Sequence, residues 1–429
     1  MINKYKIPIK TFTTCLILLS TVIQSLGWAF WKTGLGIITS TYLSWGLTIV
    51  ILLIIIRYCL NIPLNVRPNE KKIYILWLSI CGVGIVRGLL VIDNYWTAKA
   101  LMQSTLELLI PLMALIFSSK SICSFFIRKW LKIAFPLFLI TAVIGGAQGT
   151  SHFSYSIFLF FTFFISVIPK KWSIIITLIT IYMFSFYITD RAQALKAIMS
   201  ICIAIVYFFR NHVRAYILST ANWVVWIATI VIVVLFVNGS YNIFSESAQN
   251  DKGKYTTEII KADGSISVED ASADTRTGIY EDIIESAIKN DYIWFGRTPA
   301  RGNDSSLFGN IIEKISGRAE RLKNEVCFPN IFTWLGLVGM IIYILFYFQA
   351  FILALYKSKN MTIKILACFI SFHFFLGWME DNNRWDNNNV LIWMIMGMCY
   401  SNEFRNMTDD EFKRLIISCL PRKIFGFKL

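Results

Sequence analysis

The sequence has little charge. Of its 429 residues only 16% are Asp, Glu, Lys or Arg, whereas 56% are hydrophobic. Soluble domains carry about 25% charged residues, so this composition excludes a large water-soluble body. The apolar residues come in blocks of roughly twenty, the length that crosses about 30 Å of hydrocarbon. We therefore expect an all-α polytopic membrane protein, because a helix satisfies its backbone hydrogen bonds within one segment.

Signatures of metal and nucleotide chemistry are also missing. None of the nine cysteines forms a CxxC pair, and only Cys327 lies in a long polar segment. This excludes a disulfide framework and a zinc site. The three histidines have no metal-ligand spacing, and no phosphate-binding glycine loop or nucleophile elbow occurs. We therefore expect no metal and no cofactor.

The apolar blocks predict about twelve transmembrane helices. The first nine lie in residues 1–238, a large loop follows at 239–330, three more helices lie in 331–401, and a tail covers 402–429. This division into nine and three disfavours the six-plus-six plan of many transporters. The helices are expected near 11–30, 36–56, 73–92, 98–117, 131–147, 152–168, 173–189, 195–209, 222–238, 331–356, 363–379 and 389–401.

The net charge of +15 does not indicate a nucleic-acid partner. More than half of the 41 Lys and Arg residues fall in both termini and in every second short loop. This is the positive-inside pattern, which predicts that both termini are cytoplasmic and that the large loop is outside.

The large loop has two different parts. Residues 245–273 are polar and rich in Gly, Ser and Asp, a composition typical of mobile segments. Apolar residues at helical spacing predict one helix over 279–288 and a second apolar stripe over 307–315. The segment 296–302 between them has the glycines and proline of a turn.

Basic residues on the predicted outer side are few, so each is informative. Arg87 falls inside the third predicted helix, where an ionisable residue is expensive, and Glu107 in the fourth helix is its candidate partner. Both a structural Arg87–Glu107 pair and a functional role for Arg87 stay open. A guanidinium fork suits diphosphate and can stabilise it as a leaving group. The loop supplies Arg276, Arg297, Arg301, Arg318 and Arg321.

The alternative for these arginines is a solvated mixed-charge face, since the loop holds fifteen Asp and Glu against eleven Lys and Arg. The same side of the membrane offers carboxylates that could act as a general base for a sugar hydroxyl. They are Glu320, Glu325, Glu380 and Asp381.

Three segments between residues 185 and 340, taken in order, resemble a known family. The first is Thr189-Asp190-Arg191-Ala192-Gln193-Ala194-Leu195; the second runs from Arg276 through the amphipathic helix to Trp294-Phe295-Gly296; the third is Glu325 followed by Pro329 to Gly339. Together with the late large loop, they resemble the motifs of the O-antigen polymerase and O-antigen ligase superfamily.

The resemblance implies a metal-independent, GT-C-like glycosyltransferase embedded in the bacterial inner membrane, with its active site on the periplasmic face. Arg191 and Arg276 would bind the donor diphosphate, helped by Arg87, Arg297, Arg301 or Arg318. The implied partners are undecaprenyl-diphosphate-linked glycans as donor and acceptor, membrane lipid, and a chain-length regulator protein.

One departure from the family pattern concerns the base. Ligases of the family carry a His just before the re-entry Asn, whereas here Pro329 precedes Asn330. We therefore predict Glu325 as the base. The departure favours a repeat-unit polymerase over a ligase that moves finished glycan to lipid A core or protein. A glycan flippase or another transporter is the non-enzyme alternative, and it would not need a structured outer loop.

Overall fold

A computed structural model describes most of the chain after residue 65. The described residues are 66–187, 191–237, 256–260, 266–270, 275–306, 309–385, 387–421, 423–424 and 427–428, with a few positions between 14 and 53. The predicted helices at 11–30 and 36–56 therefore lie almost wholly outside the described residues.

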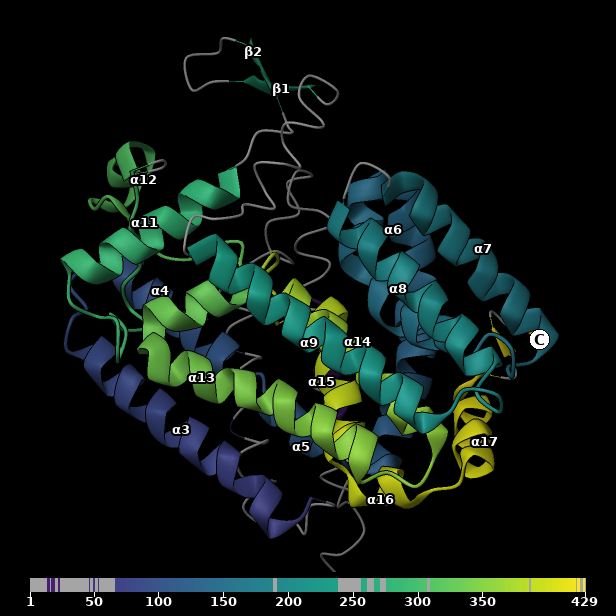
Figure 1. The fold of residues 1–429 in the computed structure, drawn as a ribbon. Helices are drawn as coiled ribbons and strands as arrows, with labels where there is room; N and C mark the ends of the chain where they lie inside the picture. Colours follow the sequence, from purple (N-terminus) through teal and green to yellow (C-terminus); the bar gives the residue numbers. More distant parts are fainter. Residues whose placement is uncertain are drawn as a thin grey trace, which may run out of the picture.

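Helices make up the body of the protein (Figure 1). The helices before and after the large loop are α3 (Pro68–Leu89), α4 (Tyr95–Leu108), α5 (Leu112–Phe117), α6 (Lys120–Phe163), α7 (Lys170–Tyr187), α8 (Arg191–Phe208), α9 (Ala215–Val237), α13 (Cys327–Tyr356), α14 (Met361–Leu376) and α15 (Asn387–Tyr400). The large loop contributes β1 (Thr256–Ile260), β2 (Ile266–Asp270), α11 (Thr275–Lys289), β3 (Asn303–Asp304), α12 (Gly309–Ser316) and β4 (Glu320–Arg321). The tail contains α16 (Asn402–Asn406), α17 (Asp409–Cys419), β5 (Lys423–Ile424) and β6 (Phe427–Lys428).

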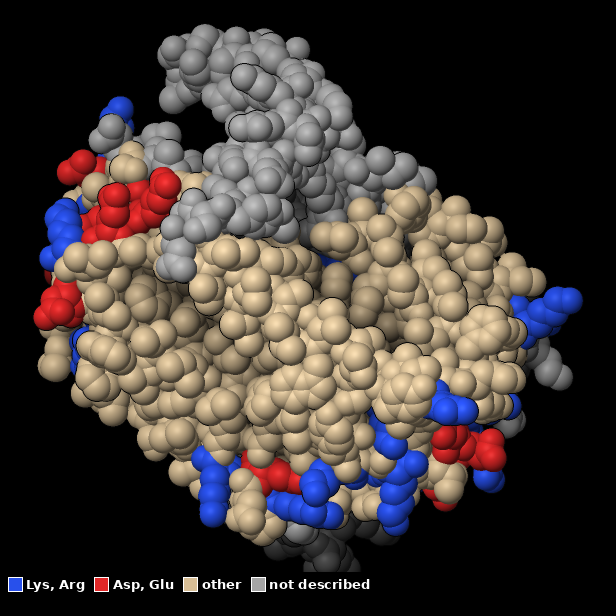
Figure 2. Space-filling model, viewed as in Figure 1, with Lys and Arg blue, Asp and Glu red and all other residues tan. Residues whose placement is uncertain are grey.

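A broad band without charged side chains crosses the surface. Figure 2 shows Lys, Arg, Asp and Glu gathered at the upper left, over α11 and α12, and along the lower edge. Four of the described helices are long and apolar enough to cross a membrane: Pro68–Leu89, Tyr95–Phe117, Ala215–Val237 and Cys327–Tyr356. The predicted class, a mostly helical membrane protein, is thus supported, but the count of twelve crossings is not confirmed. We call the two charged edges the α11 end and the α17 end.

The course of two predicted helices differs from the prediction. The sequence predicts separate helices over 131–147 and 152–168, and this is wrong: α6 runs unbroken over Lys120–Phe163. A glycine costs a helix only about 1 kcal/mol, so the small and polar residues near 145–151 do not end it. Conversely, the helix predicted over 98–117 is divided after Leu108. Pro111 lacks an N–H and disfavours helical backbone at the residue before it, so α5 starts anew at Leu112.

The core is built around α13. Tyr343 on α13 packs against Trp77 of α3 and Trp393 of α15, with ring centroids 5.3 and 6.0 Å apart. All three side chains are fully buried. The indole N–H of Trp77 donates to the carbonyl of Leu108 at 2.7 Å, which satisfies a carbonyl left free where α4 ends.

Two glycines fasten the large loop to α13. Gly336 interrupts that helix with φ +70° and ψ −171°, a region essentially restricted to glycine. It faces Gly296 of the loop, which has φ +68°. A Cβ on either glycine would overlap the main chain of the other segment. Hydrogen bonds flank this contact, from the N–H of Leu337 to the carbonyl of Ile293 at 2.8 Å and from Arg297 N–H to the carbonyl of Thr333 at 2.8 Å.

Arg87 reinforces the same contact. Its guanidinium donates to the carbonyls of Phe295 and Gly296 at 2.7 and 2.9 Å. The predicted structural pair with Glu107 is therefore wrong, because Glu107 binds Lys323 instead. These carbonyls belong to a turn where the loop meets the bundle. They accept the hydrogen bonds of the Arg87 guanidinium, so Arg87 does not need a carboxylate partner. Arg87 thus joins the end of α3 to the loop.

Candidate functional site

Three predicted arginines of the loop converge on one carboxylate. The β3–β4 hairpin pairs Asp304 with Glu320 and so brings both ends of the segment together. Arg301 binds Glu320 through two hydrogen bonds, one of them 2.8 Å from Nε to Oε2. Nitrogens of Arg297 and Arg318 lie 3.3 and 3.5 Å from Glu320 Oε1. We call these five residues, Arg297, Arg301, Asp304, Arg318 and Glu320, the loop cluster.

Two of the three guanidiniums of the loop cluster also have a second carboxylate partner. Arg297 also binds Asp304 at 2.7 Å, and Arg318 pairs with Asp93 of the α3–α4 connection. Burial alone would raise the pKa of Asp304, but hydrogen bonds from Arg297 and its neighbours lower it to about 2. Burial also favours the neutral form of Glu320, but the surrounding arginines favour its charged form more strongly, so the pKa of Glu320 is lowered. The cluster therefore holds the loop together, and diphosphate binding by its arginines stays a prediction.

A second group of charges is more deeply buried. Its members come from α4, α8, the segment before α13, and the turn 377–385 between α14 and α15. The Nζ of Lys323 lies 2.5 Å from Glu107 Oε1 and 2.7 Å from Asp381 Oδ2. A second ion pair, 2.7 Å long, joins Lys196 Nζ to Glu380 Oε1. We call this group the polar centre: Glu107, Lys196, Lys323, Glu380, Asp381 and Arg384.

The pairing between Lys323 and Asp381 keeps both of these groups charged in spite of burial. The side chains of Glu107 and Asp381 are only 5% and 3% exposed. Burial would lower the pKa of Lys323, but Asp381 and Glu107 raise it above its ordinary value. In the same way burial opposes ionisation of Asp381, and the charges of Lys323 and Arg384 lower its pKa. Asp381 is therefore a carboxylate held ionised in a low-dielectric place.

Several polar atoms of this region have no hydrogen-bond partner among the described residues. They are Glu107 Oε2, Glu380 Oε2 and the side-chain nitrogen of Asn383, all buried. Buried polar groups in proteins are almost always paired with protein or with ordered water. Both acceptors and a donor are thus available for water or for the hydroxyls of a ligand.

The two most strongly predicted arginines lie on helices that contact this same turn. Arg191 begins α8, and Lys196 is five residues later, about 7.5 Å along the helix axis, where it binds Glu380. Arg276 precedes Tyr280 by one turn of α11, and the Tyr280 hydroxyl donates to the carbonyl of Trp378. The side chain of Arg191 and all of Asp190 lie outside the described residues. The helices α8 and α11, which carry Arg191 and Arg276 near their first residues, therefore both contact the turn 377–385.

The predicted base, Glu325, has different surroundings. Its side chain is 69% exposed and lies 3.5 Å from Arg321, four residues before it. The structure does not place it in the polar centre. Nothing in the sequence singles out Lys323, because a single Lys in a mixed-charge loop carries no helical period or motif. The residues Glu107, Glu380 and Asp381 are predicted from the sequence, but no local pattern shows that they meet.

In the part of the chain that the structure describes, no group of three His, Cys, Asp or Glu residues is placed to hold a metal ion. Comparison with known proteins gave no match to a family model, to a curated protein or to a solved structure. The function is therefore argued from the residues of this chain.

Proposed function

We propose that the protein is a membrane-embedded glycosyltransferase that polymerises undecaprenyl-diphosphate-linked repeat units at the outer face of the bacterial inner membrane. One observation carries the proposal. The helices that begin beside Arg191 and Arg276 both dock on the turn 377–385, which also bears the ionised Asp381. In this proposal, cations for a diphosphate and a carboxylate for a hydroxyl would act together at this turn. The family resemblance of the same segments supports this choice.

The chemistry would divide between these residues. Arg191 and Arg276 would bind the diphosphate of the donor and balance the charge that develops as it leaves. The hydroxyl at the non-reducing end of the acceptor glycan would attack the anomeric carbon of the donor while Asp381 takes its proton. The bond between that carbon and the diphosphate oxygen breaks, and undecaprenyl diphosphate leaves with the electron pair. Attack opposite the leaving group inverts the anomeric centre.

Asp381 replaces Glu325 as our proposed base on physical grounds. A base has to be ionised and within hydrogen-bond reach of the hydroxyl, in a place from which water can be excluded. Asp381 is buried and held by Lys323, whereas the Glu325 side chain is mostly exposed to solvent. Lys323 would act as a positioning residue, because it touches the base and not the substrate.

The test uses cells in which the gene is deleted and replaced by variants. Arg191→Ala, Arg276→Ala and Asp381→Asn are each expected to reduce polymerisation about 100- to 1000-fold, the typical effect of losing a group that stabilises developing charge. Gel electrophoresis of the glycan gives chain length, and membrane immunoblots give expression. Arg214→Ala at the exposed start of α9 is the control and should leave chain length unchanged.

Different products separate the rival functions. Single repeat units on the final acceptor indicate a lost polymerase, whereas full-length glycan retained on the carrier lipid indicates a lost ligase. Chain growth by purified protein in detergent, where no compartments exist, would contradict a flippase. Normal-length polymer in Arg191→Ala and Arg276→Ala cells at wild-type expression would refute the donor-diphosphate assignment.

A further inference from the structure

A pocket at the α17 end has cations on its walls. It lies between the third and fourth turns of α6, the start of α7, and the end of α17 with the residues that follow it. Its volume is about 900 Å³. The described residues that line it are Arg128, Lys132, Pro169, Lys170, Lys171, Trp172, Ile417, Ser418, Leu420 and Pro421. We call it the basic pocket.

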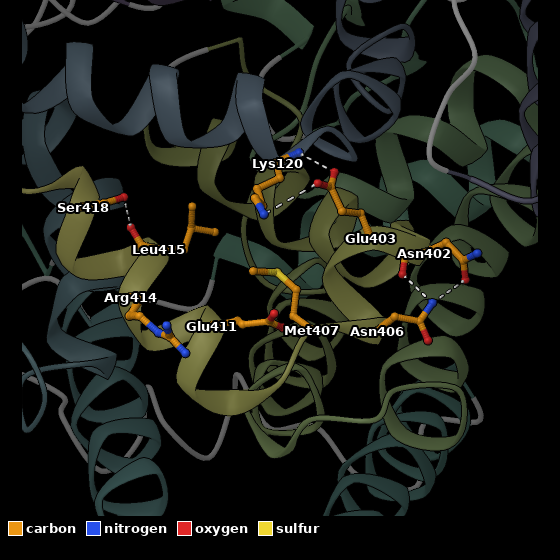
Figure 3. Close-up of a pocket in the computed structure, with 9 residues that line it drawn as sticks. All are labelled: Lys120, Asn402, Glu403, Asn406, Met407, Glu411, Arg414, Leu415 and Ser418. Atoms are coloured by element: carbon orange, nitrogen blue, oxygen red, sulfur yellow. Dashed lines mark hydrogen bonds and ion pairs between the residues drawn. The ribbon is translucent and has the colours of Figure 1, made fainter.

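Charge of one sign distinguishes this pocket from its neighbour. Four of its described lining residues are Lys or Arg and none is acidic. The adjoining pocket in Figure 3, of about 750 Å³, has Lys120 and Arg414 opposed by Glu403 and Glu411. There the backbone N–H of Lys120 donates to Glu403 at 3.2 Å. Of these two pockets, the basic pocket is the one whose described lining has cations and no carboxylate.

Hydrogen bonds fix the walls of the basic pocket, and they are made by residues other than its lysines. The indole N–H of Trp172 donates to the carbonyl of Pro421 at 3.3 Å, and Arg128 donates to the carbonyl of Ser418 at 3.1 Å. Within the described ranges, Lys132, Lys170 and Lys171 make no ion pair, and all three are exposed. Like charges gathered in one pocket repel one another, so an anion bound between them is favoured.

An apolar stripe starts at the same pocket. Ile174, Leu178 and Ile181 follow Lys171 at helical spacing along one face of α7 and are 51%, 61% and 60% exposed. A phospholipid has this pairing of groups, an anionic head and apolar chains. A free phosphate would contact the lysines and leave the stripe unused.

We infer that the basic pocket binds the headgroup phosphate of an anionic phospholipid, whose acyl chains lie along α7. Basic pockets between transmembrane helices are a known way of recognising such headgroups. The site is independent of the proposed glycosyltransferase activity, since it involves neither the polar centre nor the loop cluster. It would fix the otherwise charged junction of α6, α7 and the tail against the membrane surface.

The experiment measures lipid binding to the purified full-length protein. Phosphatidylglycerol is titrated in a neutral detergent, with phosphatidylcholine as the uncharged comparison, and bound lipid is counted by native mass spectrometry. Each Lys near an anionic surface is worth about 1 kcal/mol, so Lys170→Gln/Lys171→Gln should bind phosphatidylglycerol about 30-fold more weakly. Lys357→Gln/Lys359→Gln, which removes two exposed lysines outside the pocket, should bind like wild type.

Three results would overturn the inference. The first is equal weakening in both double variants, which would indicate a general surface-charge effect. The second is equal binding of phosphatidylcholine. The third is displacement of phosphatidylglycerol by inorganic phosphate at the same concentration, which would indicate a site for a free anion. If the double variant does not fold, Lys132→Gln changes one exposed side chain and should weaken binding about fivefold.

Discussion

Removing Lys323 tests whether the polar centre is a set of interdependent charges. In Lys323→Met the side chain keeps its length and loses its cation. Glu107 and Asp381, whose side chains are 5% and 3% exposed, would then face each other without the cation between them. Breaking a buried ion pair by removing one partner costs about 3–5 kcal/mol, because a charge is left buried and uncompensated.

A matched control lies in the same loop. Lys289 pairs with Asp304 at 3.1 Å, but its side chain is 75% exposed against 21% for Lys323. Exposed ion pairs contribute about 0–1 kcal/mol, so Lys289→Met should change stability little. Comparing the two Lys→Met variants isolates burial, since the chemical change is the same.

The measurement is thermal unfolding of each purified variant in detergent, followed by tryptophan fluorescence. A double-mutant cycle with Glu107→Gln adds a second requirement. Removing one of the two carboxylates relieves their repulsion, so the double variant should be less destabilised than the sum of the single variants by about 0.5–3 kcal/mol. Lys323→Met melting at or above the wild-type temperature would refute the reasoning, as would equal losses for Lys323→Met and Lys289→Met.

Two further predictions concern the loop. The pKa of Asp304 is about 2 against an ordinary 3.8, so its interactions stabilise the fold above about pH 4 and are lost as the pH falls towards 2. Thermal unfolding between pH 2 and 7 should show Asp304→Asn less stable than wild type at pH 7 and equal to it near pH 2; a constant difference would contradict this. Gly336→Ala should cost more than about 3 kcal/mol, because it adds overlap with the loop main chain to a backbone strain of about 1–3 kcal/mol. Gly317→Ala, at φ +75° with open space around it, should cost only about 1–2 kcal/mol, and equal losses in melting experiments would show that the overlap is absent.

Local signals in the sequence found most helices that the structure describes. The apolar periods predicted α3, α7, α8, α9, α13, α14 and α15 to within several residues at each end, and the stripe over 279–288 predicted α11. The errors fall where two local signals compete. Small residues near 145–151 predict a break, but they cost a helix too little to end it. Pro111 instead makes a break inside an apolar block. The β1–β2 hairpin lies in the segment predicted to be mobile, where composition hid its strands.

The polar centre could not be predicted in the same way, because its contacts join distant parts of the chain. Lys323 is 216 residues from Glu107, and Lys196 is 184 residues from Glu380. A sequence shows that Glu107 is costly within an apolar segment, but not which cation offsets that cost. Arg87 was the obvious candidate because it lies in the neighbouring helix. In the structure Arg87 donates to backbone carbonyls, and Glu107 forms an ion pair with Lys323 of the loop.

Gly296 of the loop and Gly336 of α13 are far apart in the sequence, but one close main-chain contact accounts for both. From sequence alone, Gly296 ends a helix-and-turn segment and Gly336 belongs to a separate transmembrane helix. In the structure each has a positive φ, and the main chain of the other segment lies where its Cβ would be. Arg87 then ties the end of α3 to the same place. The large loop is therefore fixed to the bundle by main-chain contacts, and these hold Lys323 where it can reach between Glu107 and Asp381.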